Sequence, residues 1–152
     1  YRYGGKEMLK TIPKPNFWGF KILSQLYNKR LTLPMRTNEA VEYAAFVDGD
    51  KTQVLVYAQD QDYFKNETHE ISIVVNCKAT SVTVQRIDDI HCNPKAEWIR
   101  LGKPDNLTPT QVAQIKEKTA LKAENVDFVS ENEETRINLS IKTNDVVLLN
   151  IE

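Results

Sequence analysis

Hydrophobic residues in the first 30 positions recur with the period of an α-helix. Pro13 and Pro15 lead into this segment, and proline suits the first turn of a helix because its missing N–H needs no partner there. The pattern predicts a helix over residues 16–28. At about 100° per residue, its apolar side chains fill an arc of roughly 200°, which requires two neighbours. These side chains are Trp18, Phe20, Ile22, Leu23, Leu26 and Tyr27.

The wide apolar arc has two interpretations. In one, the helix is buried in the core of its own domain. In the other, which we favour, its second neighbour is a larger domain outside this chain, because the sequence starts at Tyr1 with neither an initiator Met nor a signal peptide. We then expect Trp18, Ile22 or Leu26 to face solvent, and the patch to promote self-association through this helix.

Apolar and polar residues alternate beyond residue 42, as in strands with one buried face. Residues 31–41 show no period and form a predicted linker. Asp48-Gly49-Asp50 is typical of a hairpin turn, and the apolar run 146–149 indicates a strand covered on both faces. The predicted strands are 42–47, 53–58, 70–76, 81–88, 125–130, 137–141 and 146–149. Residues 42–152 therefore predict a mainly β fold, an antiparallel immunoglobulin-like β-sandwich.

A helical insertion over residues 93–122 interrupts the predicted strands. Pro94 opens a short helix that Gly102 ends. Thr108 suits the N-cap of a second helix, with Pro109 at its first position and Gln111 three residues after the cap. We expect the first helix to be pinned to a sheet through Trp98, Leu101 and Pro104. The narrow apolar stripe of the second places it on the surface of the sandwich.

Composition and charge narrow the possible functions. The chain has 152 residues, 41% hydrophobic and 27% charged, which is ordinary for one globular domain. Its net charge of −1 predicts no face for nucleic acid, and no apolar run reaches the about 20 residues of a membrane span. If strands 70–76 and 81–88 form a hairpin, Cys77 and Cys92 lie about 30 Å apart at about 3.3 Å per residue. We therefore expect two free thiols.

The sequence from Asp88 to Cys92 contains residue types that bind metals or catalyse reactions. Asp88, Asp89 and His91 could supply three ligands, but adjacent strand residues point to opposite faces, and no second Cys or His pair stands at zinc-like spacing. We therefore predict no metal site and no bound cofactor. We expect Asp89 or His91 to bond backbone groups in the turn instead.

Catalysis and sugar binding are two further hypotheses for the same region. Glu97 and Asp88 could act as a glycosidase pair, but both lie at an outer edge with no cleft to raise the pKa of the acid. We predict no catalytic residue in this chain. An exposed Trp98, or aromatic residues of the loop at 57–63, could stack on sugar rings. Packing in the core is the interpretation that we favour for Trp98.

Seven pieces of sequence between residues 53 and 149 resemble the C-terminal β-sandwich of family 39 glycoside hydrolases, the β-xylosidases and α-L-iduronidases. Their order and spacing carry the resemblance. The pieces are Gln53-Val54-Leu55-Val56-Tyr57, Val84-Gln85-Arg86-Ile87-Asp88, His91-Cys92-Asn93-Pro94, Glu97-Trp98, Leu101-Gly102-Lys103-Pro104, Leu107-Thr108-Pro109 and Asp145-Val146-Val147-Leu148-Leu149.

The N-terminal segment shows a related resemblance. Gly4-Gly5 and Ile12-Pro13-Lys14-Pro15 are similar to the last strand, loop and helix of the (β/α)₈ barrel in that family. Residues 1–30 would then be a remnant of that barrel. Tyr3, Gly4 and Gly5 would be a weak remnant of its substrate-binding mouth, and the two catalytic glutamates would lie on earlier barrel strands, outside this chain.

The resemblance implies a non-catalytic accessory domain of a retaining glycoside hydrolase, closer to the xylosidase branch than to the iduronidase branch. Its partners would be the missing barrel, a second copy through the N-terminal helix, and carbohydrate through the whole enzyme. We expect a secreted or periplasmic location. A carbohydrate-binding module and an immunoglobulin-like protein-interaction domain are the competing hypotheses.

Overall fold

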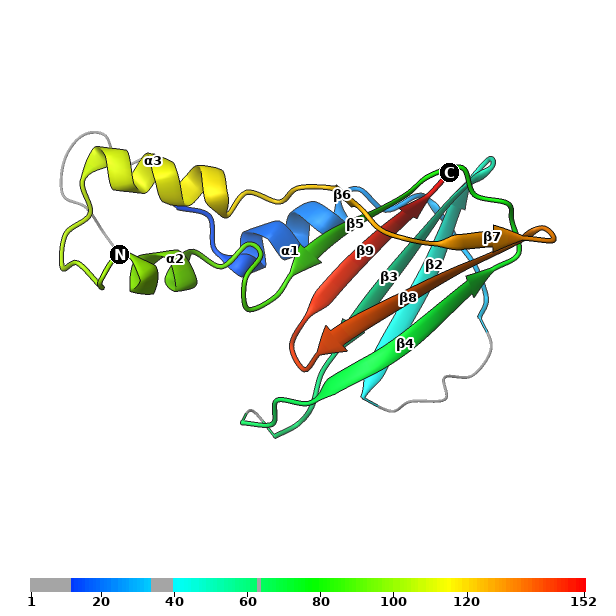
Figure 1. Ribbon diagram of the computed structural model, residues 1–152, viewed down its shortest axis with the longest axis horizontal. Helices are drawn as coiled ribbons and strands as arrows, with labels where there is room; N and C mark the ends of the chain where they lie inside the picture. The colour runs from blue at the N-terminus through cyan, green and yellow to red at the C-terminus, as the bar shows by residue number, and fades with distance from the viewer. Residues whose placement is uncertain (1–11, 34–39, 63) are drawn as a thin grey trace.

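The computed structural model describes residues 12–33, 40–62 and 64–152. Two antiparallel sheets face each other, and a helix lies on the outer face of the larger sheet (Figure 1). The larger sheet has the order β1 (Lys29–Arg30), β2 (Val41–Asp48), β3 (Lys51–Ala58), β9 (Val146–Ile151), β5 (Val82–Ile87) and β6 (Glu124–Asn125). The smaller sheet has the order β4 (Thr68–Val75), β8 (Glu134–Lys142) and β7 (Val129–Glu131). The described helices are α1 (Pro15–Leu23), α2 (Pro94–Arg100) and α3 (Pro109–Lys118).

The core between the two sheets follows from the alternation in the sequence. Every second side chain of β8 points inward, and Ile137, Leu139 and Ile141 are at most 5% exposed. They pack with inward-facing valines and leucines of the larger sheet, among them Val56 and Leu149. The prediction of a mainly β antiparallel sandwich with an N-terminal helix and a two-helix insertion is confirmed.

The turn between β2 and β3 is the predicted hairpin. Asp48 is paired with Lys51, so two residues make the connection. Gly49 has a φ of +57°, a conformation in which a residue without Cβ is not strained. Because this turn fixes the register, Val54 and Val56 face the core while Leu55 faces outward.

The outer face of the larger sheet is buried as well, under α1. Leu55 of β3 and Leu148 of β9 form a second apolar cluster with Ile22 of α1, and their exposures are 8%, 0% and 1%. Ile87 and Cys92 complete the cluster. Strands β3 and β9 are therefore covered on both faces, and for β9 this confirms the prediction made from the continuous apolar run 146–149.

Helix α1 is shorter than the predicted 16–28, because it ends at Leu23. The reason is a tertiary contact. The Gln53 side chain, 3% exposed, accepts from the Tyr27 backbone N–H at 2.9 Å and donates to the Gln25 carbonyl at 3.2 Å. It also donates to Asn150 Oδ1 at 2.8 Å. The sheet thereby binds backbone groups that a longer helix would have used itself.

Strands β4 and β5 do not form the predicted hairpin, since they belong to different sheets. The buried hydroxyl of Thr135 accepts from the Ala79 N–H at 2.9 Å and donates to the Cys77 carbonyl at 2.7 Å. These bonds hold the connection as it passes from one sheet to the other. Cys77 and Cys92 are both free thiols, although the hairpin from which we predicted this is wrong.

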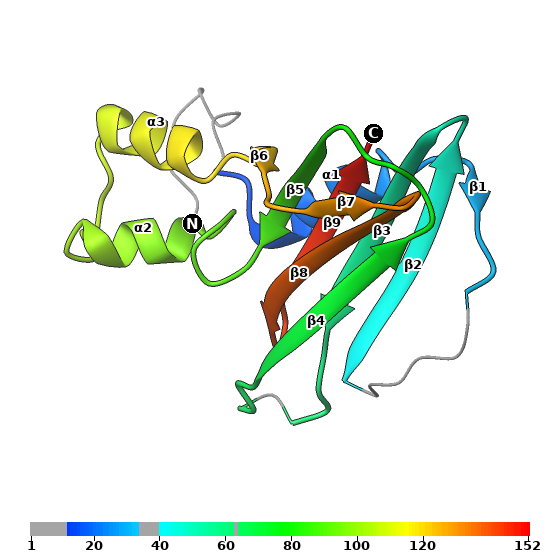
Figure 2. The ribbon, with the colours of Figure 1, turned by 45° about the vertical axis from the view of Figure 1, so that its right-hand side comes forward.

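The two helices of the insertion form as predicted, but they do not lie on the sandwich as we expected. Thr108 and Gln111 make a complete capping box, and Gly102 has a φ of +84° after α2. However, α2 and α3 pack against each other and project beyond the end of the sandwich (Figures 1 and 2). The expectations that α2 is pinned to a sheet and that α3 lies on the sandwich surface are wrong, because the two helices pack on each other instead.

We predict that Gln53→Ala lowers the free energy of unfolding by about 1–2 kcal/mol, because it leaves partly buried backbone groups of Gln25 and Tyr27 without these partners. Urea unfolding followed by tryptophan fluorescence measures this loss. Gln59→Ala, at an exposed position after β3, is the matched control and should change stability by less than about 0.5 kcal/mol. Equal effects of the two substitutions would contradict the role assigned to Gln53.

Candidate functional site

The turn that follows β5 is organised by one carboxylate. Asp88 Oδ1 accepts from the backbone N–H groups of Ile90 at 2.8 Å and His91 at 2.6 Å, and its Oδ2 lies 2.7 Å from His91 Nδ1. The side chain that bonds the turn backbone is therefore Asp88, whereas we expected Asp89 or His91. The Asp89 carboxylate is largely exposed, 3.8 Å from Lys142 Nζ.

This arrangement stabilises the charged form of Asp88. Burial raises the pKa of Asp88, but the hydrogen bonds from His91 and Ile90 outweigh burial and hold it below its usual value. In contrast, burial raises the pKa of the Cys92 thiol to about 11. Cys92 is 2% exposed and has a φ of +58°. The turn therefore contains a fixed carboxylate and an unreactive thiol.

The electrostatics of Glu97 and Asp88 do not suit a glycosidase pair. A general acid in such a pair needs a raised pKa. The Arg100 guanidinium, which lies 2.8 Å from Glu97, lowers the pKa of Glu97, and Lys118 at 3.4 Å acts in the same direction. Since both pKa values are lowered, neither carboxyl group retains a proton for a leaving group at neutral pH.

Trp98 is half-buried on α2, and its indole N–H is used within the insertion. Trp98 Nε1 donates to the Pro104 carbonyl at 3.0 Å, and the Trp98 carbonyl accepts from the Lys103 N–H at 3.1 Å. These bonds close the chain around the end of α2. A sugar-stacking role for Trp98 stays a prediction. Tyr3, Gly4 and Gly5 lie outside the described residues.

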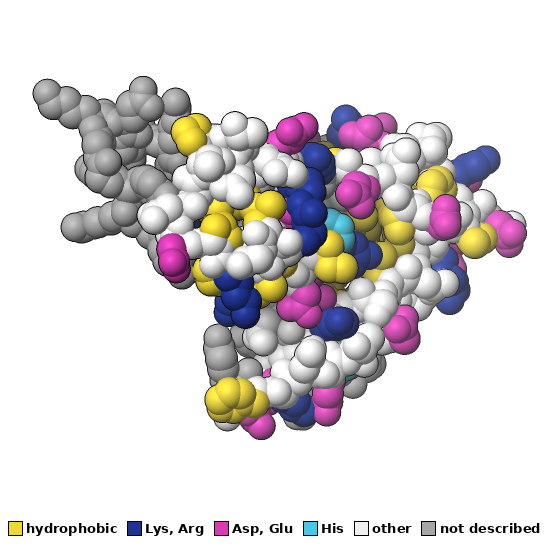
Figure 3. All heavy atoms as spheres, turned by 60° about the vertical axis from the view of Figure 1, so that its left-hand side comes forward, with side chains coloured by type: hydrophobic (Ala, Val, Ile, Leu, Met, Phe, Trp, Pro, Cys, Tyr) yellow, Lys and Arg dark blue, Asp and Glu magenta, His cyan; other side chains and the backbone are white. Residues whose placement is uncertain are grey.

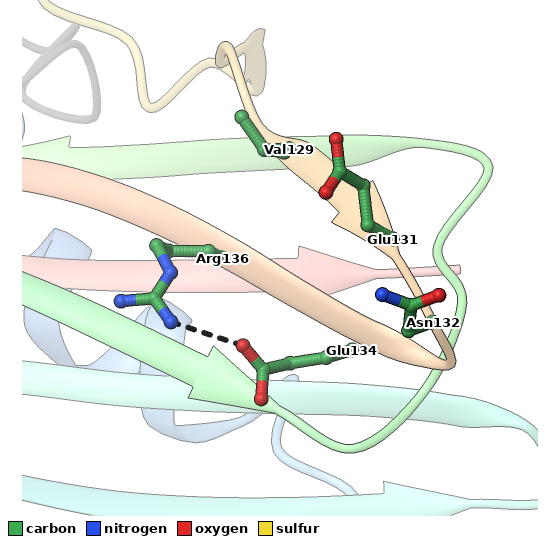
Figure 4. A pocket seen from close by; sticks show the side chains of 5 residues that line it. All are labelled: Val129, Glu131, Asn132, Glu134 and Arg136. Carbon is green, nitrogen blue, oxygen red and sulfur yellow. Dashed lines mark hydrogen bonds and ion pairs between the residues drawn. The ribbon is translucent and has the colours of Figure 1, made fainter.

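A shallow hollow of about 240 Å³ lies on the outer face of the smaller sheet (Figure 4). Its lining residues are Val129, Glu131, Asn132, Glu134 and Arg136. Arg136 is paired with Glu134 at 3.0 Å, and strands β4, β7 and β8 contain no aromatic residue. None of the residues that line this hollow is aromatic, so it offers no platform on which a sugar ring could stack.

The described residues contain neither a cluster of metal ligands nor a helix suited to a membrane. No group of three or more His, Cys, Asp or Glu side chains is placed to hold a metal ion. None of the helices in residues 12–33, 40–62 and 64–152 has the length and apolarity that a membrane span requires.

Helix α1 carries the most conspicuous apolar surface of the described chain. Phe17, Phe20 and Leu23 are 55%, 74% and 53% exposed. At 100° per residue, they lie about 180° from Trp18 and Ile22, which pack toward the sheet. We expected Trp18, Ile22 or Leu26 to face solvent, and this is wrong for Ile22, which is buried, and for Trp18 and Leu26, which are half-buried. We did not include Phe17 among the apolar side chains of the predicted helix, although it lies within residues 16–28.

Comparisons with known proteins agree on one family. The model of the family "Glycosyl hydrolases family 39" matches residues 2–134. A β-xylosidase of Caldicellulosiruptor saccharolyticus is 28% identical over 158 residues, which cover 99% of this chain and 32% of that protein. The chain therefore spans about a third of the length of this relative.

Solved structures show the same fold. The GH39 enzyme from Xanthomonas axonopodis pv. citri has a TM-score of 0.69 at 23% identity, covering 93% of this chain and 30% of that one. A monomeric β-xylosidase from Caulobacter crescentus CB15 has a TM-score of 0.66 at 21% identity, covering 95% and 31%. A bacterial orthologue of human α-L-iduronidase has a TM-score of 0.61 at 13% identity, covering 78% and 23%.

We predict that Asp88→Asn lowers the free energy of unfolding at pH 7 by about 1–2 kcal/mol. The folded-state pKa of Asp88 lies below the unfolded one, so its charge stabilises the fold above about pH 4. This contribution is lost as the pH falls through the lowered pKa. Burial, and after it the charge of Asp88, raise the pKa of Asp145. Asp88→Asn removes the repulsion between these two carboxylates, which offsets part of the stability that the substitution costs.

Urea unfolding between pH 2 and pH 7 tests this prediction. The difference between wild type and Asp88→Asn should shrink toward low pH, where both side chains are neutral. Asp89→Asn is the control, and its effect should be small at every pH because Asp89 is largely exposed. A difference for Asp88→Asn that is the same at all pH values would show that its charge is unimportant.

Proposed function

The chain belongs to the glycosyl hydrolases of family 39, and on that premise we propose that it is the non-catalytic β-sandwich of a β-xylosidase-type enzyme. In this proposal the sandwich braces the catalytic domain, and α1 is the helix that the two share. The observation that carries the proposal is the division of α1 into two opposite apolar faces. One is buried against the sheet and the other is exposed.

The buried face of α1 is attached to the sandwich in two ways. Ile22 packs among Leu55, Ile87 and Leu148, and Gln53 binds the backbone just after the helix. The exposed face, with Phe17, Phe20 and Leu23, has the size and chemistry of a surface that another domain covers. A rigid helix with one face in each domain would fix their relative orientation.

Trp18 lies on the side of α1 that packs against the sheet. Its ring lies edge-on to Phe17, with centroids 5.0 Å apart and an interplanar angle of 78°. Its indole N–H is buried and has no acceptor among the described residues, although a buried tryptophan usually finds one.

The proposed reaction of the whole enzyme is hydrolysis of a terminal β-xyloside with retention of configuration. A retaining glycosidase needs two carboxyl groups about 5–5.5 Å apart, one as nucleophile and one as acid and base. Asp88 and Glu97 are poor candidates for these roles because of their lowered pKa values. We therefore assign both catalytic groups to the covering domain. An α-L-iduronidase-like activity is the alternative for the whole enzyme.

We predict that the isolated 152-residue chain does not hydrolyse an aryl β-xyloside above the rate of buffer alone. The reason is that the proposed catalytic pair lies outside it. Release of nitrophenol from nitrophenyl β-xyloside measures the rate, with an active family 39 β-xylosidase as the positive control. Enzyme-like turnover that persists after repeated purification would refute the assignment of catalysis to another domain.

We also predict that the isolated chain self-associates through the exposed face of α1, because this face is left open to water. Sedimentation velocity should show a dimer for the wild type and a monomer for Phe20→Asp. Phe64→Asp, at a position 91% exposed in the loop after β3, is the matched control and should leave the dimer intact. A wild-type monomer at high concentration would contradict this prediction.

A further inference from the structure

The insertion between β5 and β6 is built as a unit of its own, and we call residues 93–122 the helical arm. Asn93 caps α2 by accepting from the Ala96 N–H at 3.2 Å, and Thr108 caps α3. Glu97 pairs with Arg100 within α2 and with Lys118 of α3, so the second ion pair joins the two helices. The arm therefore holds its shape through its own bonds.

The first helix of the arm, α2, lies away from the sandwich core, although Leu121 at the end of the arm packs against the cluster around Ile22. No residue of α2 is fully buried, and two views place the arm beyond the end of both sheets (Figures 1 and 2). Ile99 on α2 is 45% exposed, and Ile90 in the turn before it is 77% exposed. A loop of a few residues suffices to join neighbouring strands, so the arm has a purpose outside the sandwich.

The root of the arm is fixed to α1. Cys92, one residue before the arm, is buried in the same cluster as Ile22 of α1 and Leu148 of β9. The bonds of Asp88 hold the turn that leads into it. Because both attachments are rigid, the exposed face of α1 and the arm keep a constant orientation and can act as one surface.

The charge of the arm differs from that of the chain. Residues 93–122 contain six Lys and Arg against three Asp and Glu, whereas the whole chain has a net charge of −1. Figure 3 looks onto this end of the molecule, where Lys and Arg side chains lie beside hydrophobic ones. Such a surface complements an acidic rim around an apolar patch.

We infer that the helical arm docks on the same catalytic domain as the exposed face of α1, against an acidic surface with an apolar patch that receives Ile99. This inference rests on the proposed function. Two observations favour the catalytic domain as the partner of the arm. The arm is attached to α1, and the β-xylosidase relative is about three times as long as this chain. The sandwich would then contact the catalytic domain at two places, α1 and the helical arm. Two contacts would prevent the two domains from rotating relative to each other about α1.

Hydrogen exchange on the complete gene product and on the isolated chain, at a concentration low enough to keep it monomeric, tests the inference. In the complete protein, amides of α1 and α2 should both exchange at least about tenfold more slowly, while those of β7 and β8 should not change. If α1 slows and α2 does not, the inference is wrong and the proposed function stands. If neither slows, or if the gene encodes only these 152 residues, both are wrong.

Two variants separate docking from folding. Ile99→Asp should restore fast exchange of α2 in the complete protein but leave urea unfolding of the isolated chain unchanged, because the side chain is already exposed there. Val129→Asp, 57% exposed on β7, is the control and should change neither. Protection of α2 that disappears on dilution would assign the arm to a second copy and overturn the inference.

Discussion

The structure depends on the contact between Ile22 of α1 and the outer face of the larger sheet. Leu55 and Leu148 point away from the sandwich core, and without the helix they would face water. Burying apolar area contributes about 25 cal/mol per Å², so the sheet gains stability from a helix that precedes it in the chain. The sandwich cannot be understood as two sheets alone, because α1 belongs to its packing.

Gln53 turns this apolar contact into a specific one. Its buried amide binds backbone groups on both sides of Leu26 and ends the helix at Leu23. Apolar packing alone would tolerate sliding or rotation of α1. A bond network in the sheet that recognises one backbone segment excludes this. The outward direction of Phe17, Phe20 and Leu23 is therefore set by the sandwich, which supports a bracing role.

The sequence was sufficient to predict features that depend on neighbouring residues. Alternation located the long strands, Asp48-Gly49-Asp50 located their hairpin, and Thr108 with Gln111 located a capping box. Features that depend on distant residues were missed. The end of α1 is set by Gln53, and the separation of β4 from β5 by Thr135. The role of Asp88 was missed because its bonds need the exact shape of the turn.

The most direct test of the account is the solvent accessibility of the outer face of α1 in the complete gene product. Hydroxyl-radical footprinting with mass spectrometry reports the labelling of single phenylalanines. The account predicts that Phe17 and Phe20 label freely in a monomeric form of the isolated chain and are protected in the complete protein, while Phe64 labels equally in both. Equal labelling of Phe17 and Phe20 in the two samples would contradict it.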